Sequence, residues 1–430
     1  LPMTYPPEKI NGCIIPGFLT PDKAPNRSYP KRLAEELEKL RPEFKYGINQ
    51  YLGGSAKDWV QKIKKIVSER GKAARLLMRQ ELSGSFSNHD DVLFLVHFLA
   101  SDSVQHYLWN RATKDWDPRL DVFNLIDKEI GKTMELAPSN SKFLILSDHG
   151  FGKIDRIFNV NNWLRDEGYL KLKPKTKTYI KHGLSRIGFN QHKLEPIGEK
   201  IYNLAKQMGF LGDNLMDTVT HPLLKEFFLS SNDVDWEKTV AYSRSDIGHV
   251  RLNLTGREKR GIVDCQEGNE LKKEIITKLK KVKIPETDIS IADWVKPKES
   301  VYTGPYLKEA PDILFDPLNQ NTLGFGGAMF LSDQQFINPF RPGNHRREGL
   351  LMASGPGVTH GKTNASIMDI APTLLNIFSL PIPTQMDGKV IKEIAPNQPH
   401  YDEPTDFYSA KGQTKEDSGS REKLQGLGYL

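Results

Sequence analysis

Two apolar runs on either side of an amphipathic helix pattern constrain the fold of this 430-residue chain most strongly. The run DVLFLVHFLA at 91–100 has almost no polar interruption, which is typical of a central strand covered by helices on both faces. Residues 119–136 carry apolar side chains at helical spacing, and FLILS at 143–147 has the form of a second strand. A strand, a helix and a strand in this order predict a parallel, doubly wound α/β sheet.

Ionisable side chains follow or precede apolar runs of this kind at three places. Asp102 and His106 follow the first run, and Asp148 and His149 follow the second. A third stretch, RPGNHRREGLLMASGPG, places His345 just before another apolar run. Functional groups gather at the carboxyl ends of the strands in such sheets, so these residues are expected to converge at one edge. Two carboxylates and three imidazoles suit two zinc-like ions, which are a standard device for phosphoryl or sulfuryl transfer.

Asp102 and His106 lie four residues apart in a segment that is expected to turn into a helix. That spacing puts both side chains on one helical face, with Cβ atoms about 6 Å apart, which is close enough to share one metal ion. The alternative interpretation is that Asp102 is a helix N-cap and that His106 is a surface histidine.

Asp148 and His149 are adjacent, and adjacent side chains on a regular strand point to opposite faces. Both reach one ion only if the strand has ended before them, and Gly150 and Gly152 permit the turn that this needs. His345, which is followed by two arginines, has by itself the character of a surface loop histidine. Its assignment as a ligand depends on the three stretches occurring together and in this order.

Composition and charge argue against several classes of protein. Apolar residues make up 38% and charged residues 27%, and no window approaches the roughly 18 uninterrupted apolar residues of a membrane span, so no membrane partner is expected. Cys13 and Cys265 lack a partner at metal-ligand or redox spacing, which fits a reducing, cytoplasmic location. The net charge of +6 is densest at 171–182, where a solvated strand or loop is favoured over a phosphate-attracting patch. The chain has neither zinc-finger spacing nor an aromatic-interleaved basic motif, so no nucleic-acid partner is expected.

The rest of the chain divides into further catalytic sequence, an insertion and a tail. Residues 155–340 are less regular and are interpreted as a cap that shapes the substrate pocket. The tail from about Ala395 is polar, proline-bearing and poorly periodic, so it is expected to be mobile. The four expected regions are the first part of the catalytic domain at 1–154, the cap at 155–340, the remainder of the catalytic domain at 341–394 and the tail at 395–430. The further expected elements are a strand at 12–18, helices at 57–80, 193–209 and 268–281, a strand pair at 240–254, a Gly-rich segment at 324–329, and a helix at 366–380 capped by Ser366 or Asp369.

The motifs, taken in order, resemble those of a known superfamily. D-x-x-x-H, SDHGFG, GxHRxxGLxxASGPG, DIAPTLL and MDGKV together resemble the alkaline phosphatase superfamily. Within it, the chain is most similar to the type I phosphodiesterase/nucleotide pyrophosphatase group, particularly its predicted prokaryotic cytoplasmic phosphohydrolases. The resemblance runs from the first residues to about residue 392. It implies a three-layer αβα sandwich with a mostly parallel sheet, an inserted cap region and a mobile C-terminal tail.

The same resemblance implies how the ligands are shared between two ions. Asp102, His106 and His345 would hold one zinc-like ion, and Asp148 and His149 would supply half of the ligands of the second. The implied cofactors are therefore two divalent metal ions, with zinc favoured and manganese or iron as alternatives.

The remaining ligands in such proteins are an Asp at the end of the first sheet strand and a Thr or Ser that is also the nucleophile. No segment of this chain has the form of an apolar strand ending in Asp-Gly and followed by such a Thr. Thr4 and Thr20 have the character of turn residues. The chain, which starts at Leu1 without Met, is therefore expected to lack the N-terminal nucleophile segment, and no catalytic nucleophile is assigned within it.

The expected function is a metal-dependent phosphohydrolase that acts on a phosphate-ester small molecule, most similar to phosphodiesterases and nucleotide pyrophosphatases. Two alternatives remain open, namely a phosphomutase of the same superfamily and a non-catalytic metal-binding protein that has lost its nucleophile. A sulfatase is disfavoured because neither Cys13 nor Cys265 lies in a C-x-P-x-R setting. The substrate and the oligomeric state are left open.

Overall fold

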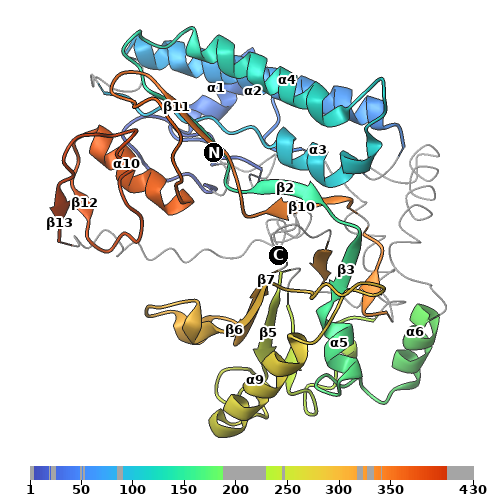
Figure 1. Ribbon diagram of the computed structural model, residues 1–430. Helices are drawn as coiled ribbons and strands as arrows, with labels where there is room; N and C mark the ends of the chain where they lie inside the picture. Colours follow the sequence, from blue (N-terminus) through green and yellow to red (C-terminus); the bar gives the residue numbers. More distant parts are fainter. Residues whose placement is uncertain are drawn as a thin grey trace.

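The computed structural model describes residues 4–18, 20, 26–48, 51, 54–84, 91–186, 229–244, 247–316, 323–326, 334–339 and 341–403. The helix expected at 193–209 and most of the expected tail lie outside these ranges. In the described part the chain is a mixed α/β protein, as predicted. Four helices gather on one side, a small sheet with its covering helices lies on the other, and β2 and β10 lie between them (Figure 1).

The helical side is formed by segments that begin with clear capping signals. The side chain of Ser55 accepts a hydrogen bond from the Asp58 amide at the start of α2, and Asp117 does the same for Arg119 at the start of α4. Apolar side chains of α2, α3 and α4 pack into one buried cluster, which includes Ile63, Val104 and Val122. The predicted helices at 57–80 and 119–136 are thereby confirmed. The four helices are α1 (Arg32–Leu40), α2 (Ala56–Leu82), α3 (Ala100–Leu108) and α4 (Pro118–Met134).

Two antiparallel strand pairs connect this helical side to the residues of interest. Strand β1 (Phe143–Leu146) pairs with β11 (Leu351–Ser354), which confirms the strands expected from FLILS and GLLMASGPG. Strand β2 (Gly150–Lys153) pairs with β10 (Gly343–Arg346), so that His345 lies opposite Phe151. The β2–β10 pair brings together two segments that are almost 200 residues apart in the sequence.

The run at 91–98 does not form the predicted central strand. It has no regular secondary structure, and no described strand pairs with it. Its side chains Val92, Leu93, Leu95 and Val96 are 41%, 50%, 54% and 38% exposed. A strand that is apolar on both faces is stable only between neighbouring strands and beneath covering helices, and the described residues supply neither here.

The predicted parallel architecture is not confirmed for the same reason. A parallel neighbour for β1 would have come from the run at 91–98. Instead, of the eight strand pairs among the described residues, six are antiparallel and two, β3 with β8 and β12 with β13, are parallel. The strand expected at 12–18 is also wrong, because that segment makes only an isolated bridge between Ile14 and Tyr29.

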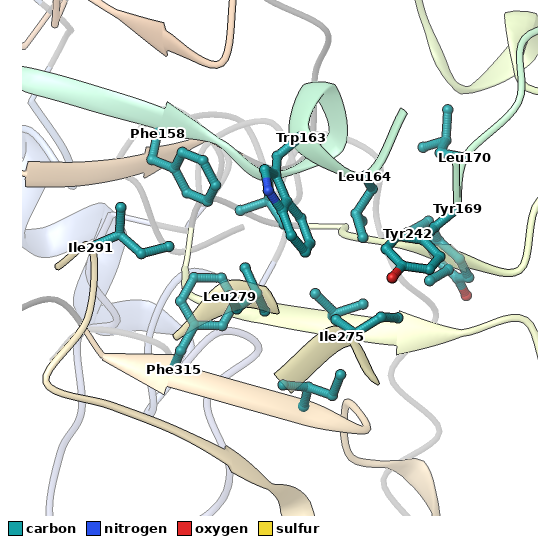
Figure 2. Packing of buried hydrophobic residues seen from close by; sticks show 14 of the residues in the cluster. Phe158, Trp163, Leu164, Tyr169, Leu170, Tyr242, Ile275, Leu279, Ile291 and Phe315 are labelled. Carbon is teal, nitrogen blue, oxygen red and sulfur yellow. The ribbon is translucent and has the colours of Figure 1, made fainter. Parts of the chain in front are cut away.

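The opposite side of the molecule holds the largest apolar core. Its four-stranded antiparallel sheet has the order β4-β5-β7-β6, which confirms the strand pair expected at 240–254. Figure 2 shows Phe158, Trp163, Leu279 and Phe315 together in this core. The elements are β4 (Ala241–Tyr242), β5 (His249–Leu252), β6 (Trp294–Pro297), β7 (Ile313–Asp316), α5 (Val160–Asp166) and α9 (Cys265–Leu279), the last of which confirms the helix expected at 268–281.

Smaller elements complete the fold. Strand β3 (Arg156–Asn159) lies between β8 (Leu323–Gly326), which contains part of the Gly-rich segment, and β9 (Phe336–Ile337). The basic run at 171–182 is partly helical, in α6 (Thr176–Arg186), rather than a strand or loop. The expected helix at 366–380 is a short 3-10 turn followed by α10 (Ile370–Ile377), and Ser366 caps it in a capping box with Asp369. Strands β12 (Ile382–Pro383) and β13 (Tyr401–Asp402) pair beside it.

Candidate metal centre

The centre begins with two side chains on α3. Asp102 and His106 are spaced by one helical turn and are buried, with 8% and 2% of their surfaces exposed. The Oδ1 atom of Asp102 lies 3.5 Å from Nε2 of His106. The predicted geometry on one helical face is therefore confirmed, and the alternative of a surface histidine is wrong because His106 is among the most buried polar residues.

Strand β10 brings His345 against this pair. Its Nε2 atom lies 3.0 Å from Nε2 of His106 and 3.3 Å from Oδ1 of Asp102. The approach of β10 to α3 depends on Gly343, because a Cβ atom there would overlap the backbone carbonyl of Gln105. The glycine in the GNH sequence thus allows the third ligand candidate to reach the first two.

Gly343 also sets the tautomer of His106. Nδ1 of His106 lies 2.9 Å from the Gly343 carbonyl oxygen, which can only accept, so Nδ1 carries the proton. The lone pair of Nε2 then points toward Asp102 and His345. Metal-binding histidines typically donate their other ring N–H to a carbonyl or carboxylate in this way.

His149 enters the cluster from the turn between β1 and β2. Strand β1 ends at Leu146, which confirms that the strand stops before Asp148. Nε2 of His149 lies 4.0 Å from Asp102 Oδ1, and its ring stacks on His345 with the centroids 3.7 Å apart. Nδ1 of His149 is 3.0 Å from the carbonyl of Gly150, so this imidazole too presents Nε2 to the cluster.

The other two residues of the DHG turn behave differently from the prediction. Asp148 has 65% of its side chain exposed, and its Oδ2 lies 3.5 Å from Nε2 of His149. Gly150 adopts no positive φ, so its role is not the expected sharp turn. A glycine is needed at position 150 because a Cβ atom there would overlap the backbone carbonyl of Glu348.

The electrostatics of the centre favour an anionic Asp102 carboxylate beside a neutral His106 imidazole. Burial by itself raises the pKa of Asp102, but the hydrogen bond from His345 and the neighbouring charges of His106, His345 and His149 outweigh it and lower the pKa. Burial lowers the pKa of His106 to about 4, so this imidazole is neutral at pH 7. A deprotonated carboxylate and a neutral imidazole are the forms that ligate a metal ion.

The Oδ2 atom of Asp102 is placed where a bound cation would stabilise it. Oδ2 of Asp102 is buried and has no hydrogen-bond partner in the described part of the chain. An unpaired buried carboxylate oxygen is costly unless a positive charge compensates it. Ligand atoms of Asp102, His149 and His345 lie within 4.8 Å of one another, and His106 lies within 3.5 Å of two of these residues. A donor set of one carboxylate and several imidazoles fits a zinc-class ion.

The structure places Asp102, His106, His149 and His345 together, with Asp148 exposed beside His149. The expected first site of Asp102, His106 and His345 is compact, with 3.0–3.5 Å between each pair of ligand atoms. His149, expected at a second ion, also lies beside Asp102. Their roles as ligands stay predictions.

A comparison with known protein families matches the part of the chain that holds most of the ligand candidates. Residues 20–227 match the family described as type I phosphodiesterase / nucleotide pyrophosphatase. This match confirms the resemblance seen in the motifs, and the family is part of the alkaline phosphatase superfamily. The matched range includes α3 and β2, with four of the five ligand candidates, whereas His345 lies beyond it. The family supports hydrolysis of phosphoesters as the type of chemistry.

Neither the curated proteins nor the solved structures contain a match to the chain. Within the described residues, every helix is too short or too polar to span a bilayer.

Sequence reasoning missed the aromatic surroundings of this phosphodiesterase-family site. The ring of Phe151 lies within 6 Å of three of the imidazoles. Trp109 stacks on Phe151 and carries the guanidinium of Arg119 at 4.7 Å from its own ring centroid. The position of Phe151 in the SDHGFG motif was visible in the sequence, but its partner across the strand pair was not.

Proposed function

We propose that this protein is a metal-dependent phosphohydrolase of the phosphodiesterase/nucleotide pyrophosphatase type. The single observation that carries the proposal is the Asp102 carboxylate, whose Oδ2 atom is buried without a hydrogen-bond partner among the described residues while Oδ1 lies 3.3–4.0 Å from three imidazole nitrogens, in a region that matches this family. An anionic oxygen in that environment is expected to be neutralised by a bound divalent cation.

Asp102, His106 and His345 would hold one zinc-class ion, for which manganese or iron are the alternatives. Asp148 and His149 would contribute to a second. Such ions, when bound, supply Lewis acidity that stabilises charge on a phosphoryl group. The chain's own residues orient this chemistry, because the carbonyls of Gly343 and Gly150 hold the Nδ1 protons of His106 and His149.

The attacking hydroxyl is proposed to come from a Thr or Ser upstream of these 430 residues. The family resemblance places that residue after an apolar strand ending in Asp, and no Ser or Thr of this chain has such a setting. Residues 155–340 are proposed to act as a cap over a phosphate-ester substrate, and the cysteine usage favours a cytoplasmic location.

The metal centre is tested by zinc binding to the metal-stripped chain. We expect His345→Ala and Asp102→Ala each to lower zinc content, because each removes a ligand. His360→Ala and Asp115→Ala are matched controls, since both residues are exposed and belong to no part of the cluster. Unchanged zinc content in both ligand variants would contradict the assignment.

The reaction is tested separately with an aryl phosphodiester. The 430-residue chain is expected to give negligible turnover, and the product of the whole coding sequence is expected to give metal-dependent turnover. Robust turnover by the 430 residues would show that the nucleophile lies within them. If the protein made from the whole coding sequence bound zinc but did not hydrolyse the aryl phosphodiester, the proposal of a hydrolase would be wrong.

A further inference from the structure

Phe151 lies at the centre of the metal-binding cluster although it has no ligand atom. It is the direct cross-strand partner of His345 in the β2–β10 pair. Its ring meets the imidazole of His106 edge to face, with the centroids 4.7 Å apart and an angle of 82°. It meets His345 at 5.3 Å and 76°, and His149 at 5.9 Å and 53°.

The backbone hydrogen bonds of the cluster leave the imidazole planes incompletely determined. The carbonyls of Gly343 and Gly150 fix one ring nitrogen of His106 and one of His149. Where the backbone restrains one ring nitrogen, the tilt of the ring about that atom is restrained by the contacts of its other atoms. The neighbouring side chains must therefore restrict that tilt, and the ring of Phe151 borders all three imidazoles.

Phe151 is itself held in place. Trp109 stacks on it with the centroids 6.1 Å apart and an angle of 19°. Arg119 lies over Trp109 and is paired with Asp117 at 2.7 Å. Edge-to-face and offset-stacked aromatic pairs are each favourable by about 0.5–1.5 kcal/mol beyond the area that they bury. The ring is thus supported on the side of Trp109 and contacts the imidazoles with its remaining surface.

We propose that Phe151 is a positioning residue that holds the imidazoles of His106, His149 and His345 in a mutual arrangement competent to bind metal. This inference rests on the proposed metal centre. A positioning role differs from ordinary core packing in its consequence. Loss of the aromatic ring lowers the affinity for metal as well as the stability of the fold. Removing groups that orient metal ligands typically lowers metal affinity about 10–100-fold.

The test measures zinc affinity of the metal-stripped chain by competition with a chromogenic chelator, together with thermal unfolding of the metal-free form. Phe151→Leu is expected to weaken zinc binding by about tenfold or more. Phe151→Tyr keeps the ring and is expected to restore affinity close to that of the wild type. Phe336→Leu is the matched control, because Phe336 is a half-buried strand phenylalanine that packs against Phe158 instead.

The outcomes separate this inference from the proposed function. If the wild type binds zinc and Phe151→Leu binds it equally well, even with a lowered unfolding temperature, Phe151 only packs and the inference is wrong. If Phe151→Tyr binds as weakly as Phe151→Leu, the aromatic ring is not what positions the ligands. If the wild type binds no zinc at all, the metal centre itself is wrong and the inference falls with it.

Discussion

The four-stranded sheet and the strand pairs around the metal centre are built in different ways. The sheet β4-β5-β7-β6 lies against α5 and α9 over a core in which Ile313 and Ile275 are fully buried. Around the candidate centre, β1 and β11 form a two-stranded sheet in the part of the chain that the structure describes, and Leu146 and Met352 are 40% and 49% exposed. The region without ligand candidates therefore has the stronger core, whereas the positions of the ligand candidates depend on close backbone approaches and hydrogen bonds.

This difference predicts that stability and metal binding can be changed independently. Substitutions in the core around the sheet are expected to lower the free energy of unfolding without changing the affinity of the centre for zinc. Substitutions in β10 or β2 are expected to change that affinity with smaller losses of stability. The predictions below begin with the largest expected effect.

The largest effect is expected from Asp312→Ala beneath the sheet. The Asp312 carboxylate is buried and accepts hydrogen bonds from Arg257 at 2.6 and 2.8 Å and from the Leu252 amide at 2.7 Å, with Lys298 at 3.2 Å. Among the described residues, its loss leaves the largely buried Lys298 without a carboxylate and Arg257 with only Glu258 at 3.2 Å, which costs about 3–5 kcal/mol. Chemical denaturation measures this cost. Asp288→Ala is the control, because that carboxylate is fully exposed beside Lys283 and its loss should leave the free energy of unfolding almost unchanged.

The same carboxylate gives a pH dependence with a defined sign. Burial raises the pKa of Asp312, but the hydrogen bonds and charge of Arg257, the Leu252 amide and the charge of Lys298 outweigh it, so the pKa is lowered. Its stabilising contribution is therefore full above the unfolded pKa of about 3.9 and is lost as the pH falls through the lower folded value. The difference in unfolding free energy between the wild type and Asp312→Asn should stay constant from pH 7 to 5 and shrink below about pH 4. A difference that shrinks as the pH rises instead would contradict this account.

A slightly smaller effect is expected from Ile313→Ala in β7. Ile313 is fully buried between neighbouring strands, so the truncation leaves a cavity and costs about 2–5 kcal/mol. Leu95→Ala is the matched control from the exposed run at 91–98, and its expected change is within about 0.5 kcal/mol. Equal losses in the two variants would mean that the run at 91–98 is buried in solution.

The smallest effect on stability, with a clear effect on zinc affinity, is expected from Gly343→Ala. The added Cβ would overlap the carbonyl of Gln105, so β10 must shift away from α3, at a cost of about 1–3 kcal/mol. The shift carries His345 away from His106, and zinc affinity should fall. Gly131→Ala in α4 is the control, because its Cβ would meet open space and should stabilise the helix by up to about 1 kcal/mol without changing zinc affinity. Unchanged zinc binding in Gly343→Ala would show that the centre tolerates movement of β10.

Much of the local structure could be predicted from sequence because it depends on neighbours along the chain. Ser55 and Asp117 cap helices where the pattern places their starts, and the turn after β1 ends the strand before Asp148. The prediction for 91–98 was wrong because an apolar run shows only that a strand there would need cover on both faces. It does not show that covering segments are present. The mostly parallel sheet depended on that strand and was not confirmed with it.

The sequence alone determined the helical spacing of Asp102 and His106, the order of the motifs and hence the family match over residues 20–227. These properties are encoded in short segments whose chemistry does not depend on distant contacts. Only the tertiary structure decided that His345 meets His106 across 239 residues and that Phe151 lies beneath three imidazoles. Strand register and the close approach of β10 to α3 decide these contacts, and both arise from packing between segments that are far apart in the chain.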